Sequence, residues 1–116
     1  MLLEILEKAR RAVDVAQEKQ ASDILLLDTK EICSYADYLI IMSAESERQM
    51  ESIVQDLDDA LRGKLPYSFR REGQSESGWI LIDIGGVVVH LFLPEERDYY
   101  GLEKIWGRAN PLLRIQ

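Results

Sequence analysis

The chain has 116 residues, of which 47% are hydrophobic and 30% charged, a composition typical of one globular domain over residues 1–116. Its formal net charge of −7 argues against direct binding to free nucleic acid, because phosphate contacts need clustered lysines and arginines. Cys33 is the only cysteine, so a disulfide framework is excluded and a cytoplasmic, reducing compartment is expected. No signal peptide and no membrane-spanning segment are expected.

The first half of the chain predicts a helix and two strands. Residues 2–19 carry apolar side chains at alternating steps of four and three, which predicts an amphipathic helix. Residues 23–28 form a continuous apolar run between two acids, which predicts a strand buried on both faces at the centre of a sheet. After a polar connection, residues 37–42 predict a second strand.

A second helix is predicted to begin after Ser46. Ser46 and Gln49 match a capping box, and apolar side chains continue at helical spacing as far as Leu61. A weaker pattern predicts a short strand over residues 67–72, and a polar loop follows over residues 73–78.

The strongest pattern predicts a β-hairpin over residues 79–93, WILIDIGGVVVHLFL. Two apolar runs flank Gly85-Gly86, a pair suited to a two-residue turn. With that turn, alternating side chains separate into a wholly aliphatic face, expected in the core, and a second face. The second face carries Trp79, Leu81, Asp83, Val88, His90 and Phe92.

The C-terminal part predicts one more helix. Residues 94–98 are expected to turn the chain, residues 99–106 to form a short helix, and Asn110 to begin a short tail. The element order is therefore helix, two strands, helix, three strands and helix. This order predicts a single α/β domain, in which a mixed sheet of about five strands is flanked by helices.

Few residues offer catalytic or metal-binding chemistry. Asp28, Asp83 and His90 all lie on or beside predicted strands and are the candidates for an acid–base or metal site. One histidine and the lack of paired ligand spacings leave such a site without a full set of roles. We therefore expect no enzyme, no metal and no cofactor. The structural explanation is a contact between Asp83 and His90 that orients the imidazole at a surface.

A protein-binding surface is the alternative use of the second face. Tryptophan and tyrosine dominate interface hot spots because they bury much area at a low entropic cost. Trp79 is the best surface candidate, since it shares a face with Asp83 and His90. Other aromatic residues of the last third of the chain are Phe92, Tyr99, Tyr100 and Trp106.

Several short motifs occur together in a characteristic order. They are Asp28 after an apolar strand, Ala36-Asp37-Tyr38, the SAESERQ turn, Trp79-x-x-x-Asp83, Val88-Val89-His90, and Arg97-x-x-Tyr100-x-Leu102-Glu103-x-x-Trp106. As an ordered set they resemble the ribosomal silencing factor family, also called RsfS or Iojap. Ile84 and Gly86 depart from the family, which more often has an aromatic and an acid at those positions.

The resemblance implies a translation repressor. Members of this family bind the large ribosomal subunit through a basic ribosomal protein at the subunit interface, the one numbered fourteen, and prevent the small subunit from joining. The resemblance also implies a nucleotidyltransferase-like fold without catalytic residues and a homodimer in the free state. On this interpretation, Trp79, Leu81, His90 and Phe92 form the contact centre, and Asp83, Tyr99, Tyr100 and Glu103 add polar and charged contacts.

Two other hypotheses stay open on the sequence alone. The first is an unrecognised or degenerate nucleotidyltransferase or hydrolase that uses Asp28, Asp83 and His90. The second is a structural dimerisation module whose aromatic face is its own self-interface, in which case a second copy buries Trp79.

Overall fold

The structure is a computed structural model that describes residues 4–64 and 66–116, so the predicted helix start at Leu2 lies outside the described residues. Within the described residues, none of the helices combines the length and the apolar character needed to span a membrane. The elements are α1 (Ile5–Glu18), β1 (Ser22–Asp28), β2 (Tyr38–Ser43), α2 (Glu47–Leu61), β3 (Arg70–Glu72), the 3-10 helix η1 (Ser75–Ser77), β4 (Trp79–Asp83), β5 (Val87–Phe92), α3 (Pro94–Tyr100), α4 (Leu102–Ile105) and β6 (Asn110–Ile115).

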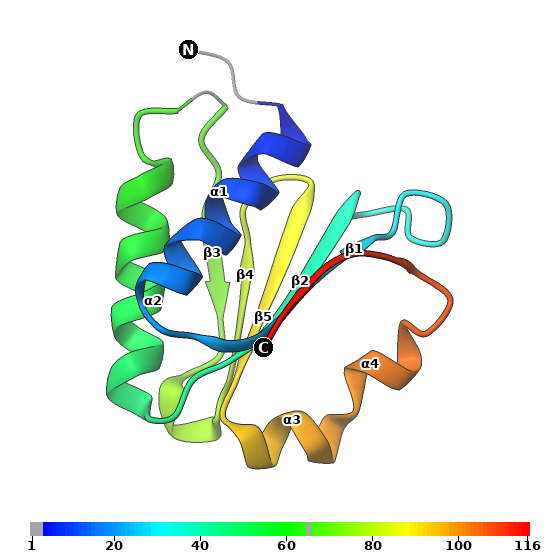
Figure 1. Ribbon diagram of the computed structural model, residues 1–116. Coiled ribbons are helices and arrows are strands. Elements are labelled where there is room, and N and C mark those ends of the chain that lie inside the picture. Colours follow the sequence, from blue (N-terminus) through cyan, green and yellow to red (C-terminus); the bar gives the residue numbers. More distant parts are fainter. Residues whose placement is uncertain (1–3, 65) are drawn as a thin grey trace.

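The strands of the described residues form one mixed sheet of six strands in the order β3-β4-β5-β2-β1-β6. The β2–β5 pair is parallel, and the other neighbouring pairs are antiparallel. Helices α1 and α2 cover the first face of the sheet, whereas α3 and α4 lie on the second face (Figure 1). The predicted α/β fold with a mixed sheet is confirmed.

The hairpin of β4 and β5 has the predicted register. Trp79 lies opposite Phe92 and Leu81 opposite His90. Gly85 and Gly86 have φ angles of 89° and 81°, which glycine adopts without the steric cost of a Cβ atom. The predicted aliphatic face of the hairpin packs in the core with residues of α1 and α2. All of its side chains are 0% exposed, namely Ile80, Ile82, Ile84, Val87, Val89 and Leu91.

A lysine from α1 holds the turn of this hairpin. Lys8 Nζ donates to the carbonyl oxygens of Ile84 at 2.8 Å and Gly85 at 3.0 Å. Burial lowers the pKa of Lys8, while the nearby Asp83 carboxylate acts in the opposite direction. The contact fixes the turn end of β4 and β5 to the helix that packs beneath them.

One of the two hydrogen bonds of the predicted capping box at α2 is confirmed. Ser46 Oγ accepts a hydrogen bond from the backbone N–H of Gln49 at 3.1 Å. The reciprocal bond differs, because Gln49 Oε1 accepts from the backbone N–H of Glu45 at 2.7 Å. Its Nε2 also donates to the carbonyl oxygens of Lys19 and Gln20, both at 3.0 Å. One side chain therefore joins the start of α2 to the end of α1.

The predicted C-terminal tail is wrong, because Asn110–Ile115 form β6 at the edge of the sheet. Five of its six residues are exposed, so the strand has no buried side and no alternating apolar pattern. Strand β1 is buried on both faces, as its apolar run predicted, with Ile24 and Leu26 on one face and Leu25 and Leu27 on the other. It is not at the centre of the sheet, because it lies between β2 and the edge strand β6.

Two further boundaries differ from the prediction. Residues 94–98, expected as a turn, form most of α3, where Pro94 provides the φ angle of a first helical residue. Gly101, with φ 58°, separates α3 from α4 and divides the predicted single helix. The strand predicted over residues 67–72 is limited to Arg70–Glu72.

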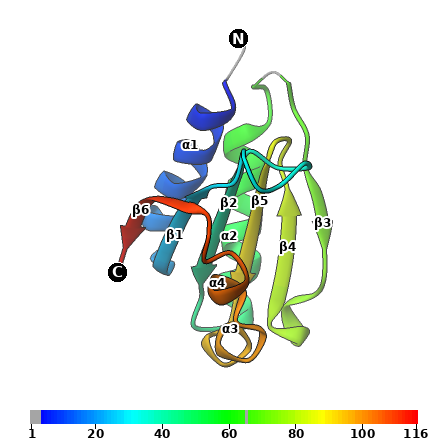
Figure 2. The same ribbon diagram turned by 90° about the vertical axis from the view of Figure 1, so that its right-hand side faces the viewer.

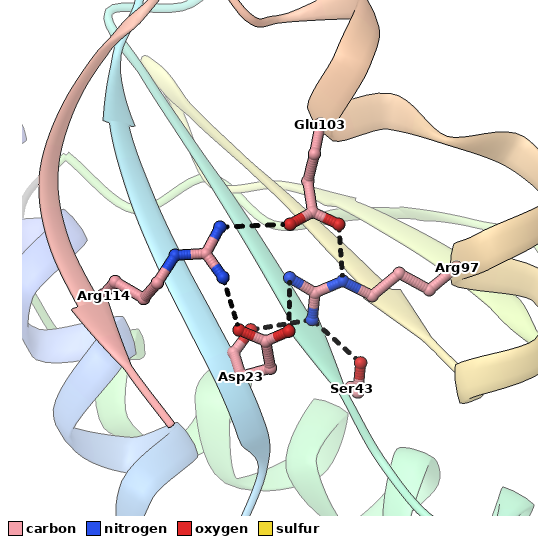
Figure 3. Close-up of polar contacts among 5 residues, drawn as sticks. All are labelled: Asp23, Ser43, Arg97, Glu103 and Arg114. Atoms are coloured by element: carbon pink, nitrogen blue, oxygen red, sulfur yellow. Dashed lines mark hydrogen bonds and ion pairs between the residues drawn. The ribbon is translucent and has the colours of Figure 1, made fainter.

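A buried arginine attaches α3 to the sheet. Arg97 is 5% exposed, and its Nε donates to Glu103 Oε2 in α4 at 3.0 Å. Its Nη1 donates to the carbonyl oxygen of Asp23 at 2.7 Å and to Ser43 Oγ at 2.8 Å. Arg114 of β6 forms ion pairs with the carboxylates of Asp23 and Glu103, at 2.8 Å from Asp23 Oδ1 and 3.2 Å from Glu103 Oε1 (Figure 3). This network links α3, α4, β1, β2 and β6.

The two arginines of the network are expected to differ in their contribution to stability. Arg97→Met leaves the Asp23 carbonyl, the Ser43 hydroxyl and Glu103 without their buried donor, and should lower the free energy of unfolding by about 2 kcal/mol or more. Arg114→Met removes a side chain that is 43% exposed, and should cost less than about 1 kcal/mol. Urea denaturation followed by circular dichroism measures both. Equal losses in the two variants would contradict the assignment of Arg97 as the buried anchor.

Candidate protein-binding face

Aromatic side chains cluster on the second face where β4, β5 and α3 meet. The ring of Trp79 lies 4.4 Å from that of Tyr100, 5.1 Å from Phe92 and 5.8 Å from His90, measured between centroids. Phe92 is 0% exposed, whereas Trp79 is half-buried and Tyr100 is 43% exposed. Tyr99 packs edge-on against Tyr100 and is 83% exposed. Trp79, Tyr99 and Tyr100 therefore form an accessible aromatic layer, which rests on the buried ring of Phe92.

His90 supports Trp79 from the neighbouring strand. The indole Nε1–H of Trp79 donates to Nδ1 of His90 at 3.1 Å. His90 is 6% exposed, and burial lowers its pKa to about 4. The imidazole is therefore neutral at pH 7, which leaves Nδ1 able to accept. The expected contact with Asp83 is replaced by this bond, since Asp83 Oδ1 accepts from the backbone N–H of Gly85 at 2.9 Å.

Two hollows open on the second face beside the aromatic cluster. None of the helices in the described part of the chain passes in front of β3 and β4, while α3 and α4 lie over the lower part of the sheet (Figure 2). The Asp83 hollow, of about 240 Å³, is lined by Tyr35, Arg70, Glu72, Leu81, Asp83 and Val88. The Trp79 hollow, of about 300 Å³, is lined by Glu72, Gly73, Ser77, Trp79, Leu81 and Tyr100. Because Glu72 and Leu81 line both, the two hollows are adjacent.

The structure separates the predicted contact residues by their exposure. Phe92 and His90 are buried, so they support the surface from beneath and do not form the expected contact centre. Glu103 is bound within the Arg97 network. Among the predicted contact residues, those that reach the surface without being held in that network are Trp79, Leu81, Asp83, Tyr99 and Tyr100.

Sequence reasoning missed five residues that line the hollows, which are Tyr35, Arg70, Glu72, Gly73 and Ser77. Glu72 and Arg70 belong to a strand of three residues, too short to show a pattern. Their register, with Glu72 opposite Leu81, is a tertiary feature. Tyr35 is an isolated aromatic in a polar loop, which was the one available signal.

The candidate catalytic residues do not converge. Asp28 pairs with Tyr38, which pairs with Val87, and directly opposite residues point to the same face. Val87 packs on the first face, so Asp28 points away from the side that carries Asp83 and His90. Strands β2 and β5 also separate β1 from β4, a span of about 14 Å across the sheet. In the described part of the chain, no group of three or more His, Cys, Asp or Glu side chains is arranged to hold a metal ion.

Comparisons with known proteins identify a single family. The family model for ribosomal silencing factor during starvation (RsfS) matches residues 3–116. Ribosomal silencing factor RsfS of Bacillus subtilis is 41% identical over 90% of this chain and 86% of the relative. Mitochondrial assembly of ribosomal large subunit protein 1 of Mus musculus is 32% identical over 81% of this chain and 42% of the relative.

A solved structure supports the same assignment. The crystal structure of a Chromobacterium violaceum protein superposes with a TM-score of 0.83 at 32% identity, and the match covers 90% of this chain and 88% of that chain.

His90 is expected to make stability depend on pH between 7 and 5. The unfolded imidazole takes up a proton near pH 6.5, whereas the folded one stays neutral down to about pH 4. Acidification therefore favours the unfolded state, and the free energy of unfolding should fall by about 2 kcal/mol by pH 5. His90→Gln should remove this dependence, because His90 is the only histidine. Urea denaturation at several pH values measures it, and an unchanged slope in the variant would contradict the role of His90.

Proposed function

The chain belongs to the ribosomal silencing factor family. On this premise, we propose that it represses translation by binding the large ribosomal subunit and preventing the small subunit from joining it. The proposed contact is the basic ribosomal protein numbered fourteen, at the subunit interface. The mechanism is steric occlusion, so it requires no chemical step and no cofactor.

The aromatic layer on the second face carries this proposal. Trp79 and Tyr100 are accessible, and the buried Phe92 and His90 hold Trp79 in one orientation. An aromatic anchor that is already ordered loses little side-chain entropy when a partner covers it. The net charge of −7 would attract a basic partner and speed the encounter.

The dimensions of the domain fit a role in occlusion. Its principal extents are 37 × 31 × 24 Å. A body of this thickness, held at the interface of the large subunit, would keep the small subunit at a distance greater than direct contacts can span. One relative, the mouse protein, is named for assembly of the ribosomal large subunit, which supports the choice of subunit.

Trp79→Ala should weaken binding to purified large ribosomal subunits by about 2–4 kcal/mol, because it removes the central anchor. Co-sedimentation with isolated large and small subunits measures the effect. Tyr67→Ala is the matched control, since Tyr67 is a 41% exposed aromatic that bonds to Asp58 of α2 on the other side of the sheet. The parent and the control should bind the large subunit selectively. A folded Trp79→Ala protein that binds as tightly as the parent would exclude this face.

Sedimentation of the free proteins tests the alternative of a dimerisation module. If the aromatic layer is a self-interface, the parent should be a dimer and Trp79→Ala a monomer. If that change occurs without any binding of the parent to large subunits, the dimerisation hypothesis replaces the proposed function.

A further inference from the structure

The Asp83 hollow contains two carboxylates that form no ion pair among the described residues, although the charge of Lys8 lies near Asp83 on the first face. Glu72 lies opposite Leu81, and Asp83 lies opposite Arg70, so all four side chains point to the second face. The ion pairs among the described residues involve other acids. Asp83 uses Oδ1 to accept from Gly85, which leaves Oδ2 available.

The remaining walls of this hollow are suited to a hydrocarbon stem. Leu81 and Val88 form its floor on β4 and β5, and the 66% exposed Tyr35 lines its side. The loop between β1 and β2, which carries Tyr35, crosses over the upper end of the sheet toward β4 (Figure 2). Lysine and arginine lay their methylene groups on such apolar surfaces and keep the charged end among polar groups. A tyrosine ring adds attraction for a cation.

Arg70 carries the opposite charge to the two carboxylates, so its removal should change the affinity for a charged partner in the opposite direction. It is the one cation among the residues that line the hollow, where Glu72 and Asp83 are the two anions. The lining therefore carries one net negative charge, in a chain whose net charge is −7. A positively charged guest is attracted by both carboxylates and repelled by Arg70, and an anionic guest would experience the opposite forces.

We propose that the Asp83 hollow receives a lysine or arginine side chain of the ribosomal partner, an inference that rests on the proposed function. The charged end of that side chain lies between Glu72 and Asp83, and its stem packs on Tyr35 and Leu81. The adjacent Trp79 hollow receives an apolar part of the same partner. Glu72 and Asp83 thus determine which surface is selected, while Trp79 provides most of the affinity.

Charge-neutral variants of near-identical shape test this assignment on purified large ribosomal subunits. The double variant Glu72→Gln/Asp83→Asn keeps the oxygen that accepts from Gly85, and should bind about threefold to tenfold more weakly. Its affinity should also depend less on salt concentration than that of the parent. Arg70→Gln should bind about twofold more tightly, because it removes the like charge. The matched control Glu47→Gln/Asp59→Asn makes the same charge change on α2, which covers the first face.

The outcomes separate this inference from the function on which it rests. If Trp79→Ala loses binding while Glu72→Gln/Asp83→Asn binds like the parent, the cation site is wrong and the proposed function stands. If the double variant binds more tightly and Arg70→Gln more weakly, the hollow takes an anionic group instead. Equal losses in the double variant and its α2 control would assign the effect to overall charge and overturn the specific site. Failure of the parent to bind large subunits would overturn both proposals.

Discussion

The register of the β4–β5 hairpin is the constraint on which the rest of the structure depends. Side chains alternate along a strand, so a shift of one residue would place Trp79 against α1 and α2 and expose the aliphatic core residues. Gly85 and Gly86 set that register through their positive φ angles. Lys8 then holds the turn from the first face. The proposed binding face is thus defined by a contact on the opposite side of the sheet.

The aromatic layer also depends on the position of α3, which is attached to the sheet mainly through the hydrogen bonds of one arginine. Of the described residues in α3, Arg97 is the buried one. It places Tyr100 beside Trp79 through hydrogen bonds to Asp23 and Ser43, which belong to β1 and β2. A short helix with little apolar area therefore has a defined position, because an arginine can bond to several elements at once.

Local patterns predicted the parts of the fold that local interactions determine. The hairpin and the cap of α2 have sequence signals within a few residues, and both are present. Strand β6 has none, because its exposed side chains show no period. The Arg97 network joins residues up to 91 positions apart, and no local pattern indicates such a contact. The burial of Phe92 likewise depends on α3 folding back over β5, so sequence placed Phe92 on the correct face but not at the correct depth.

The contact between Trp79 and His90 also allows binding at the aromatic layer to be detected by NMR without an attached probe. A chain with one histidine gives one set of imidazole resonances in an NMR spectrum. Here that ring accepts a hydrogen bond from the indole at the centre of the proposed interface. Any partner that tilts Trp79 changes the tautomer balance or the chemical shift of His90. The occupancy of the face can therefore be followed from a buried atom that the partner never touches.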